Sequence, residues 1–249
     1  MLFPFIDAIF LAMAEEPKYT KTIVCLANSR KLSGRCLAGK ELTGGKTGVW
    51  IRPVSARPHE EISEEERRYH DGHSPSLLET IAIPFMAPKA HTFQSENHLI
   101  DPGYYWQKTG DATWAQVEGA LDNVQGALWI NGHSTYHGEN DQVPDAEAAK
   151  LTNSLLLVRP TNLRITVGEE GGVFGPAKRK ARANFTLNQA HYSLSLTDAE
   201  MERKYLQGQN GTFPVANAIL CVSLGEPYKG HAYKLAAALI TQDRVKKNG

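Results

Sequence analysis

Four cations stand close together in the stretch Lys178-Arg179-Lys180-Ala181-Arg182. The stretch follows a glycine-rich segment, GEEGGVFGPA, and leads into RANFTL, whose composition is typical of a β-strand. We therefore expect the cations to lie on one arm of a β-hairpin and not on a helix. Lysine and arginine side chains exposed in this way can contact phosphate groups, although most charge runs are only solvated surface.

Aromatic residues lie near these cations in the sequence. Arg164 is on the preceding predicted strand, Phe174 is in the turn, and Phe185 and Tyr192 follow on the next strands. If the rings and the cations share one face of the sheet, base stacking contributes about 1–3 kcal/mol per base to the binding of single-stranded nucleic acid. This region therefore predicts a basic surface with stacking rings.

A second set of cations lies near the N-terminus. The segment KTIVCLANSRKLSGRCLAGK presents Arg35 and Lys40, and GVWIRPV presents Arg52 on the same strand face as Trp50. The two segments pair if the Gly-Gly between them forms a hairpin turn. Facing outward, Trp50 and Arg52 would form a stacking and phosphate-binding surface. Facing inward, Trp50 would be core and Arg52 a buried arginine with an acidic partner.

The C-terminal turn LGEPYKG leaves a similar choice open. Tyr228 lies in this turn, and Lys234 follows on the next predicted strand. Glu226 can pair with Arg52 or with Lys234, which would make these residues architectural. The same residues are equally suited to contact a ligand.

Sequence motifs for catalysis are weak. Gly34 and Gly39 have the spacing of a phosphate loop and Lys40 follows, but Glu41 stands where Ser or Thr would hold magnesium. The nine histidines are scattered, and no GxSxG motif marks a nucleophile. We predict no catalytic residue, no metal and no cofactor.

An enzyme acting on a nucleotide or nucleic acid is the alternative, with His191, Asp198 or Glu226 in a cleft between two units. Asp198 has a second interpretation. The stretch Thr197-Asp198-Ala199-Glu200 fits a capping box, which predicts that Asp198 begins a helix.

The composition limits the possible partners and the compartment. The 249 residues contain 27 Lys plus Arg and 27 Asp plus Glu, so no overall charge favours a polyanion. Three cysteines without a CxxC pair argue against a disulfide framework and a four-thiolate zinc site. We expect free, buried thiols in a reducing cytoplasm.

The N-terminal stretch MLFPFIDAIFLAMAEEP is apolar for about a dozen residues, which is shorter than the ~20 that span a membrane. It lacks the basic start of a signal peptide. We predict that residues 1–17 are an extension, with Met13 as the natural start, and that the protein has no membrane partner.

Short β-branched and aromatic segments bounded by Gly, Pro, Asn or Asp dominate the rest and predict a mainly β protein. Helices are expected only at 60–70, 113–124 and from Thr197 to about Leu206. The predicted strands are 21–27, 48–54, 77–85, 127–132, 154–160, 162–167, 182–187, 191–197 and 218–224.

A polar, turn-rich segment divides these strands into two groups. We predict a first β-unit at residues 18–135, a linker at 136–153 and a second β-unit at 154–245.

Several blocks in order, KTIVCLANSRKLSGRCLAGKEL, GVWIRPVS, SLLLVRPTNLRITV, RANFTLNQAHYSLSLTD and LCVSLGEPYKGHAYKLAAALI, resemble the dual OB-containing domain family. This bacterial module has two oligonucleotide/oligosaccharide-binding (OB) barrels, and the resemblance spans about residues 20–240. It implies two OB-like Greek-key β-barrels with short connecting helices, whose strand 2–3 faces and flanking loops bind ligand. It also implies a component that binds nucleic acid or nucleotide in a bacterial defence system, and it transfers no catalytic residue.

We therefore predict that the partner is a single-stranded nucleic acid or a nucleotide. The alternative in which the barrels bind other proteins is favoured by the zero net charge. The predicted nucleic-acid-binding residues are Arg35, Lys40, Trp50, Arg52, Arg164, Lys178, Arg179, Lys180, Arg182, Tyr228 and Lys234.

Overall fold

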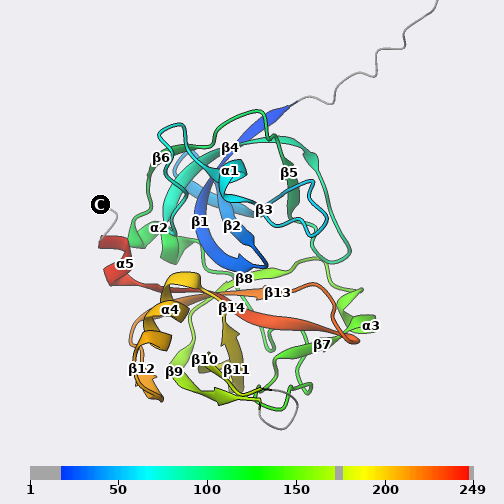
Figure 1. Cartoon of the computed structure of the whole chain (residues 1–249), viewed down its shortest axis with the longest axis vertical. Coiled ribbons are helices and arrows are strands. Elements are labelled where there is room, and N and C mark those ends of the chain that lie inside the picture. Colours follow the sequence, from blue (N-terminus) through cyan, green and yellow to red (C-terminus); the bar gives the residue numbers. More distant parts are fainter. Residues whose placement is uncertain (1–17, 172–175, 247–249) are drawn as a thin grey trace, which may run out of the picture.

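The computed structural model describes residues 18–171 and 176–246, which are mainly β, with short helices between strands (Figure 1). The predictions about residues 1–17 and Phe174 lie outside the described residues. In chain order the elements are β1 (Tyr19–Lys31), β2 (Gly34–Thr43), β3 (Lys46–Val54), α1 (Glu64–Arg67), β4 (Glu79–Pro88), β5 (Asn97–Ile100), β6 (Gln107–Asp111), α2 (Trp114–Gly119), β7 (Gln142–Pro144), α3 (Asp145–Ala148), β8 (Leu155–Val158), β9 (Thr161–Glu170), β10 (Lys178–Leu187), β11 (Ala190–Leu196), α4 (Ala199–Gln207), β12 (Gly211–Pro214), β13 (Ala218–Leu224), β14 (His231–Thr241) and α5 (Gln242–Lys246).

The first sheet closes into a barrel. β1 pairs with β2, β2 with β3, β3 with β5, β5 with β4, and β4 again with β1, while β6 adds to β4. Only β3 and β5 run parallel. The β2–β3 hairpin turns at Gly44 and Gly45, whose φ angles of 57° and 80° suit a tight turn that glycine adopts at no steric cost.

The second sheet repeats this order. Its strands run β9-β10-β11-β14-β13-β8, with β11 and β14 parallel and β12 added to β9. β8 and β9 are separated only by Arg159 and Pro160, so together they act as one bent first strand that joins both sides of the barrel. Proline suits the bend because it has no N–H to donate to a ladder. A helix follows the third strand in each barrel, α1 in the first and α4 in the second. The predicted pair of OB-like barrels is confirmed.

The apolar run of β1 supplies two cores at once. Ile23 and Cys25 point into the first barrel, whereas Val24 and Leu26 belong to a cluster that includes Leu157 of β8 and residues of β13 and β14. Strand alternation explains this split, because neighbouring residues face opposite sides. The two barrels therefore share an apolar core, and Figure 1 shows β1 and β2 next to β13 and β14.

The segment predicted as a linker contains β7 and α3. β7 pairs with β14, and Glu139 forms a bridge with Ser193 of β11. Residues 139–144 thus lie against both β11 and β14, which pair with each other only at Ser195–Leu235 and Leu196–Ala236.

The three predicted helices are present but short. α1 begins after Ser63, and its capping box unites Ser63 with Glu66. α4 begins after Asp198, whose side chain accepts hydrogen bonds from Glu200 N and Met201 N. The cap is therefore Asp198 and not Thr197, because a short carboxylate at this position reaches two orphan amides of the first turn.

Candidate nucleic-acid interface

Lys40 and Trp50 lie in the seam between the barrels. They are paired across β2 and β3, and both contact Asp122. Lys40 Nζ is 2.5 Å from Asp122 Oδ1, and Trp50 Nε1 donates to Asp122 Oδ2 at 3.0 Å. The same Oδ2 accepts from Leu157 N at 2.7 Å, which ties the first barrel to β8 of the second. Lys40 and Trp50 thus make structural contacts between the barrels, and their role in ligand binding stays a prediction.

Arg52 points into the protein, as in the second of the two alternatives given by the sequence. Its side chain is buried, with 4% of the residue exposed, and it donates to Ser154 Oγ at 2.7 Å. Its Nη2 lies 3.4 Å from the carboxylate of Glu96, which is also buried. A buried arginine with an acidic partner supports the fold and leaves little surface for a phosphate. Glu226 pairs with Lys31 at 2.7 Å, so its predicted pairing with Arg52 or Lys234 is wrong.

Lys234 is also inside the protein, with 1% of the residue exposed. Its Nζ donates to Ile130 O at 2.5 Å and to Asn131 Oδ1 at 3.2 Å, and it lies over the ring of Tyr192. Burial lowers the pKa of Lys234 from 10.5 to about 7, against the opposing effect of Asp141. The position excludes direct contact with a large external ligand.

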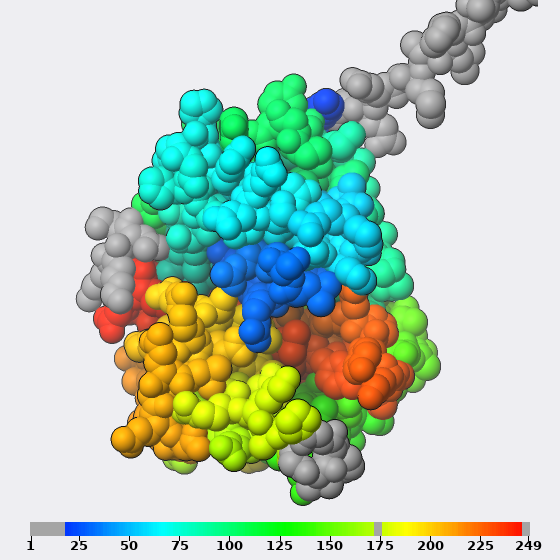
Figure 2. Space-filling model, viewed as in Figure 1, coloured from blue at the N-terminus to red at the C-terminus, as the bar shows by residue number. Residues whose placement is uncertain are grey.

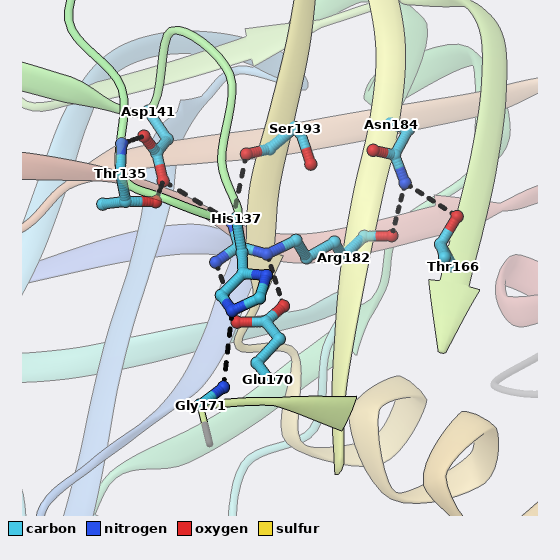
Figure 3. A network of polar contacts seen from close by, with 9 residues as sticks. All are labelled: Thr135, His137, Asp141, Thr166, Glu170, Gly171, Arg182, Asn184 and Ser193. Carbon is cyan, nitrogen blue, oxygen red and sulfur yellow. Dashed lines mark hydrogen bonds and ion pairs between the residues drawn. The ribbon is translucent and has the colours of Figure 1, made fainter. Parts of the chain in front are cut away.

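Arg182 is neutralised by a polar network on the outer face of the second barrel (Figure 3). Its guanidinium binds both carboxylate oxygens of Glu170, at 2.5 and 3.0 Å, and donates to Ser193 O. Asp141, 3.5 Å away, in turn accepts from the backbone and hydroxyl of Thr135. Arg182 therefore holds the segment before β7 against β9 and β10.

Two other contacts in Figure 3 stabilise the outer face of the second barrel. His137 Nε2 accepts from Gly171 N at 3.3 Å, and Asn184 Nδ2 donates to Thr166 Oγ1 at 3.0 Å.

The predicted stacking rings are in the core. Phe185 and Tyr192 stack with ring centroids 5.2 Å apart inside the second barrel, with 3% and 1% of the residues exposed. Alternation on β10 points Ala181, Ala183 and Phe185 inward, so the ring of Phe185 lies on the opposite face from the cation Arg182. The stacking prediction is wrong for these two rings.

Arg164 and Tyr228 are exposed, but in separate places. Arg164 lies on β9 beside Pro214 of β12, and Tyr228 lies in the β13–β14 turn beside Lys229. Neither residue lines the groove described next.

A groove of about 660 Å³ brings the remaining cations together. It lies where the β1–β2 hairpin of the first barrel meets α4 and the start of β10. Figure 2 shows this hairpin, in blue, reaching over the second barrel, with the yellow surface of α4 on one side and the orange-red surface of β13 and β14 on the other. We call this the basic groove. Its cations are Arg30, Arg35, Lys178, Arg179, Lys180 and Arg203.

Arg179 joins β10 to the end of α4. Its guanidinium donates to Leu206 O at 2.9 Å, to Gly208 O at 2.7 Å and to Asn210 Oδ1 at 2.9 Å. The last carbonyls of a helix have no partner within it and carry partial negative charge, which a cation satisfies. Arg179 therefore fixes α4 beside the basic groove.

Gly34 positions Arg35. A Cβ at Gly34 would lie 2.6 Å from Ile62 O, so only glycine allows β2 to approach this segment. Arg35 and Ile62 then exchange backbone hydrogen bonds of 3.0 Å. The hairpin is held in place by its backbone, and the Arg35 side chain remains available to the groove.

The charges of the groove are mostly uncompensated. Arg30 pairs with Glu202 at 3.3 Å, and Glu202 is the single carboxylate among the lining residues. Glu170 is the strand neighbour of Lys178, but its carboxylate binds Arg182. Within residues 18–171 and 176–246, Arg35, Arg203, Lys178 and Lys180 form no ion pair.

Arg67 is a buried cation whose charge interacts with that of Arg35. The pKa of Arg67 is lowered first by burial and then by the charge of Arg35. Its Nη1 donates to Ile62 O, while its Nε has no partner in the described part of the chain. Two like charges lie close to each other here, so an anion at Arg35 would be attracted by both.

A model of the dual OB-containing domain matches residues 21–239, nearly the whole chain. The chain belongs to the dual OB-containing domain family. No curated protein and no solved structure matches it. In this dual OB-containing domain protein the basic groove lies between the barrels, where a hairpin of one meets a helix of the other.

The residues proposed for an enzyme lie apart. His191 Nδ1 is 3.1 Å from Thr186 Oγ1 on the outer face of the second barrel. Asp198 caps α4 and binds Arg244, and Glu226 binds Lys31 in the β13–β14 turn. The described residues hold no cluster of three or more His, Cys, Asp or Glu suited to a metal ion. No helix in the described part of the chain is long and apolar enough to cross a membrane.

Two groove residues were missed from the sequence. Arg30 belongs to the same basic stretch as Arg35, and the approach of the β1–β2 hairpin to α4 brings it in. Arg203 lies on α4 one turn after Ala199, on the helix face that lines the groove. The helix was predicted from the sequence, but its contact with the β1–β2 hairpin was not. Arg30 and Glu202, which make this contact, are 172 residues apart, and no local sequence pattern indicates a contact over that separation.

Proposed function

We propose that this protein binds the phosphates of a single-stranded nucleic acid or a nucleotide in the basic groove. The observation that carries the proposal is the convergence of six cations from four elements, β1, β2, β10 and α4, around a single carboxylate. Five of the six, all but Arg30, have no ion pair within the described residues. With zero net charge, the attraction for an anion is local to this groove.

Groove geometry increases the effect of these charges. Low-dielectric walls focus the field of the cations that line them, and anions are drawn to the groove rather than to the whole surface. Phosphate contacts supply most of the sequence-independent affinity for nucleic acids. A single strand or a nucleotide fits the groove better than a duplex, because a flexible strand can follow a concave surface.

The test removes three cations that have no acidic partner, Lys178→Ala, Lys180→Ala and Arg203→Ala. Binding of a short fluorescent single-stranded oligonucleotide is measured by anisotropy over a range of salt concentrations. Each phosphate contact on a single strand contributes ~0.7 to the slope of log affinity against log salt. We expect weaker binding at low salt and a slope smaller in magnitude by about 2 if all three contact phosphates.

A matched control removes three exposed cations outside the groove, Lys46→Ala, Arg164→Ala and Lys204→Ala. Lys204 follows Arg203 on the same helix, so the pair of variants compares two adjacent residues with different positions relative to the groove. Binding that falls equally in both triple variants overturns the groove as the site. If the unmodified protein binds no single-stranded DNA, RNA or nucleotide at low salt, the nucleic-acid proposal fails and the protein-interaction alternative replaces it.

A further inference from the structure

A second hollow lies on the other side of the β1–β2 hairpin. It has a volume of about 270 Å³ and is bounded by this hairpin and by the β13–β14 hairpin. Cys36, Leu224 and Leu235 contribute apolar walls, and Tyr233 contributes an aromatic side chain. The Lys31–Glu226 ion pair joins the two hairpins here at 2.7 Å. We call this hollow the hairpin pocket.

The hairpin pocket and the basic groove meet at Arg30. Arg30 is a lining residue of both hollows, and its guanidinium contacts Glu202 on the groove side. In Figure 2 the blue hairpin separates the yellow surface of α4 from the orange-red surface of β13 and β14. A ligand that passes Arg30 can therefore place an anionic part in the groove and an apolar part in the pocket.

Polar groups in the pocket wall have unused hydrogen-bonding capacity. Gln94 is 3% exposed, and its Oε1 accepts from Asn97 Nδ2 at 3.1 Å, while its amide nitrogen donates to no atom of residues 18–171 and 176–246. Arg52 Nε is buried and has no partner in the same part of the chain. The Gln94 amide is thus a donor in the pocket wall that an acceptor atom of a ligand can bond, whereas the fully buried Arg52 Nε lies behind this wall.

The size of the pocket limits its occupant. Small-molecule sites usually have volumes of about 300–1,000 Å³, so a pocket of 270 Å³ lies just below that range and takes only a small group. Apolar walls with a few hydrogen-bonding groups suit a flat heterocycle, which has apolar faces and polar edges. The neighbouring cations suit a phosphate attached to that ring.

We propose that the hairpin pocket holds the base of one nucleotide whose phosphate lies in the basic groove. This inference rests on the proposed function, because it requires the groove to bind phosphate. It adds that recognition includes one base at a defined place and is not limited to the phosphate backbone. The nucleotide is either free or the terminal unit of a single strand.

Cys36 reports on the pocket directly. It is the partly exposed cysteine that lines the pocket, while Cys25 and Cys221 are buried. The rate at which 5,5′-dithiobis(2-nitrobenzoate) modifies the native protein therefore measures access to Cys36. The Cys36→Ser variant gives the background from the two buried thiols.

The probes are AMP, GMP, CMP and UMP, each compared with ribose 5-phosphate and inorganic phosphate. At ten times Kd about one pocket in eleven is open, so the best-binding nucleotide slows modification about tenfold. We expect little protection from ribose 5-phosphate or inorganic phosphate, which lack a base. The Lys178→Ala, Lys180→Ala, Arg203→Ala variant should require a higher nucleotide concentration for the same protection.

A 5′-phosphorylated oligonucleotide distinguishes the two sources of the nucleotide. Protection by this oligonucleotide, and its loss when the terminal base is removed, identifies a strand end; protection by mononucleotides alone identifies a free nucleotide.

Equal protection by ribose 5-phosphate would overturn the base pocket, since phosphate alone would then shield the thiol. Nucleotides that compete with the fluorescent oligonucleotide for the groove but leave Cys36 fully reactive would also overturn it, while the proposed function would stand. If nucleotides do not protect Cys36 and the oligonucleotide does not bind, both the base pocket and the proposed function are overturned.

Discussion

Two sets of cations in this protein have similar sequence surroundings and opposite environments. Lys40 and Arg52 lie in the seam between the barrels, buried beside Asp122 and Glu96. The exposed cations of the basic groove come from β10, α4 and the β1–β2 hairpin, and most have no acidic partner in the described chain. Lys40 and Arg52, and four of the six groove cations, were predicted from the sequence to contact a ligand.

The physical difference is the cost of an unpaired charge. A charge removed from water must be paired and hydrogen-bonded, because its desolvation is expensive. An exposed charge has no such requirement, so it can remain without a partner until an anion arrives. Pairing and burial, and not residue type, separate architectural cations from candidate ligand contacts here.

The largest expected effect is at Arg52. Arg52→Ala leaves the buried carboxylate of Glu96 without its cation, and breaking a buried ion pair in this way costs about 3–5 kcal/mol. Urea unfolding followed by circular dichroism measures the loss. The Arg52→Ala, Glu96→Ala double variant is expected to recover part of it, and a single-variant loss below about 1 kcal/mol would show that the seam pair resembles a surface salt bridge.

Asp122 gives the second largest effect. Asp122→Ala removes the acceptor of Lys40 Nζ, Trp50 Nε1 and Leu157 N, all in the seam. Unpaired buried donors and a lost charge-assisted bond together cost about 2–3 kcal/mol of unfolding free energy, measured as above.

The control for Asp122 is Glu118→Ala. Glu118 binds Arg159 at 2.7 Å, but both side chains are more than a third exposed. Exposed pairs contribute about 0–1 kcal/mol. Equal losses in the two variants would contradict the distinction between buried and exposed pairs.

The third effect depends on pH. The pKa of Lys234 is about 7 in the folded protein and has an ordinary value of 10.5, because burial disfavours its charged form. Between these values the unfolded chain holds a proton that the folded protein lacks, so stability rises with pH, by up to about 1.4 kcal/mol per pH unit. We expect the unfolding free energy of the native protein to rise above pH 7, and this rise to disappear in Lys234→Met.

The measurement ends below about pH 8.5, where free thiols begin to ionise. Burial raises the pKa of Cys25 to about 12 and also raises that of Cys221, so ionisation of the unfolded thiols lowers stability at higher pH. A parallel pH dependence in the native protein and in Lys234→Met would mean that Lys234 stays charged in the fold.

Local patterns predicted most of the long strands, but the prediction of a strand at residues 127–132 is wrong, and β14 was not among the predicted strands. The apolar run of β1 and the Gly-Gly turn before β3 were readable, and the closed barrel order came from the family resemblance. The stacking rings could have been excluded, because Phe185 is an odd number of residues from Arg182 and so faces the other side of β10.

Partners of the charged residues were not readable in the same way. Arg52 binds Ser154, which is 102 residues away, and no spacing indicates that contact. The groove has the same origin, since its cations come from hairpin, strand and helix that meet only in the folded chain. Hence the sequence identified Lys178, Arg179 and Lys180 through their clustering, but gave no reason to prefer them to Lys40 or Arg52.

The smallest expected effect on stability is in the basic groove itself. Exposed substitutions away from packed or paired groups usually change stability by within about 0.5 kcal/mol, so the Lys178→Ala, Lys180→Ala, Arg203→Ala variant should unfold almost as the native protein does. Removing like charges that face each other also relieves repulsion, and any gain in stability should shrink as salt screens it, with a Debye length of about 10 Å at 0.1 M. Urea unfolding at low and high salt measures the change in stability and its salt dependence on the same variant that is used for binding.

A loss of stability above about 1 kcal/mol per substitution would show that these cations support the fold as the cations of the seam do. Weaker oligonucleotide binding by the variant would then be explained by unfolding. An unchanged or slightly higher stability, together with reduced binding, assigns the loss to the groove charges alone.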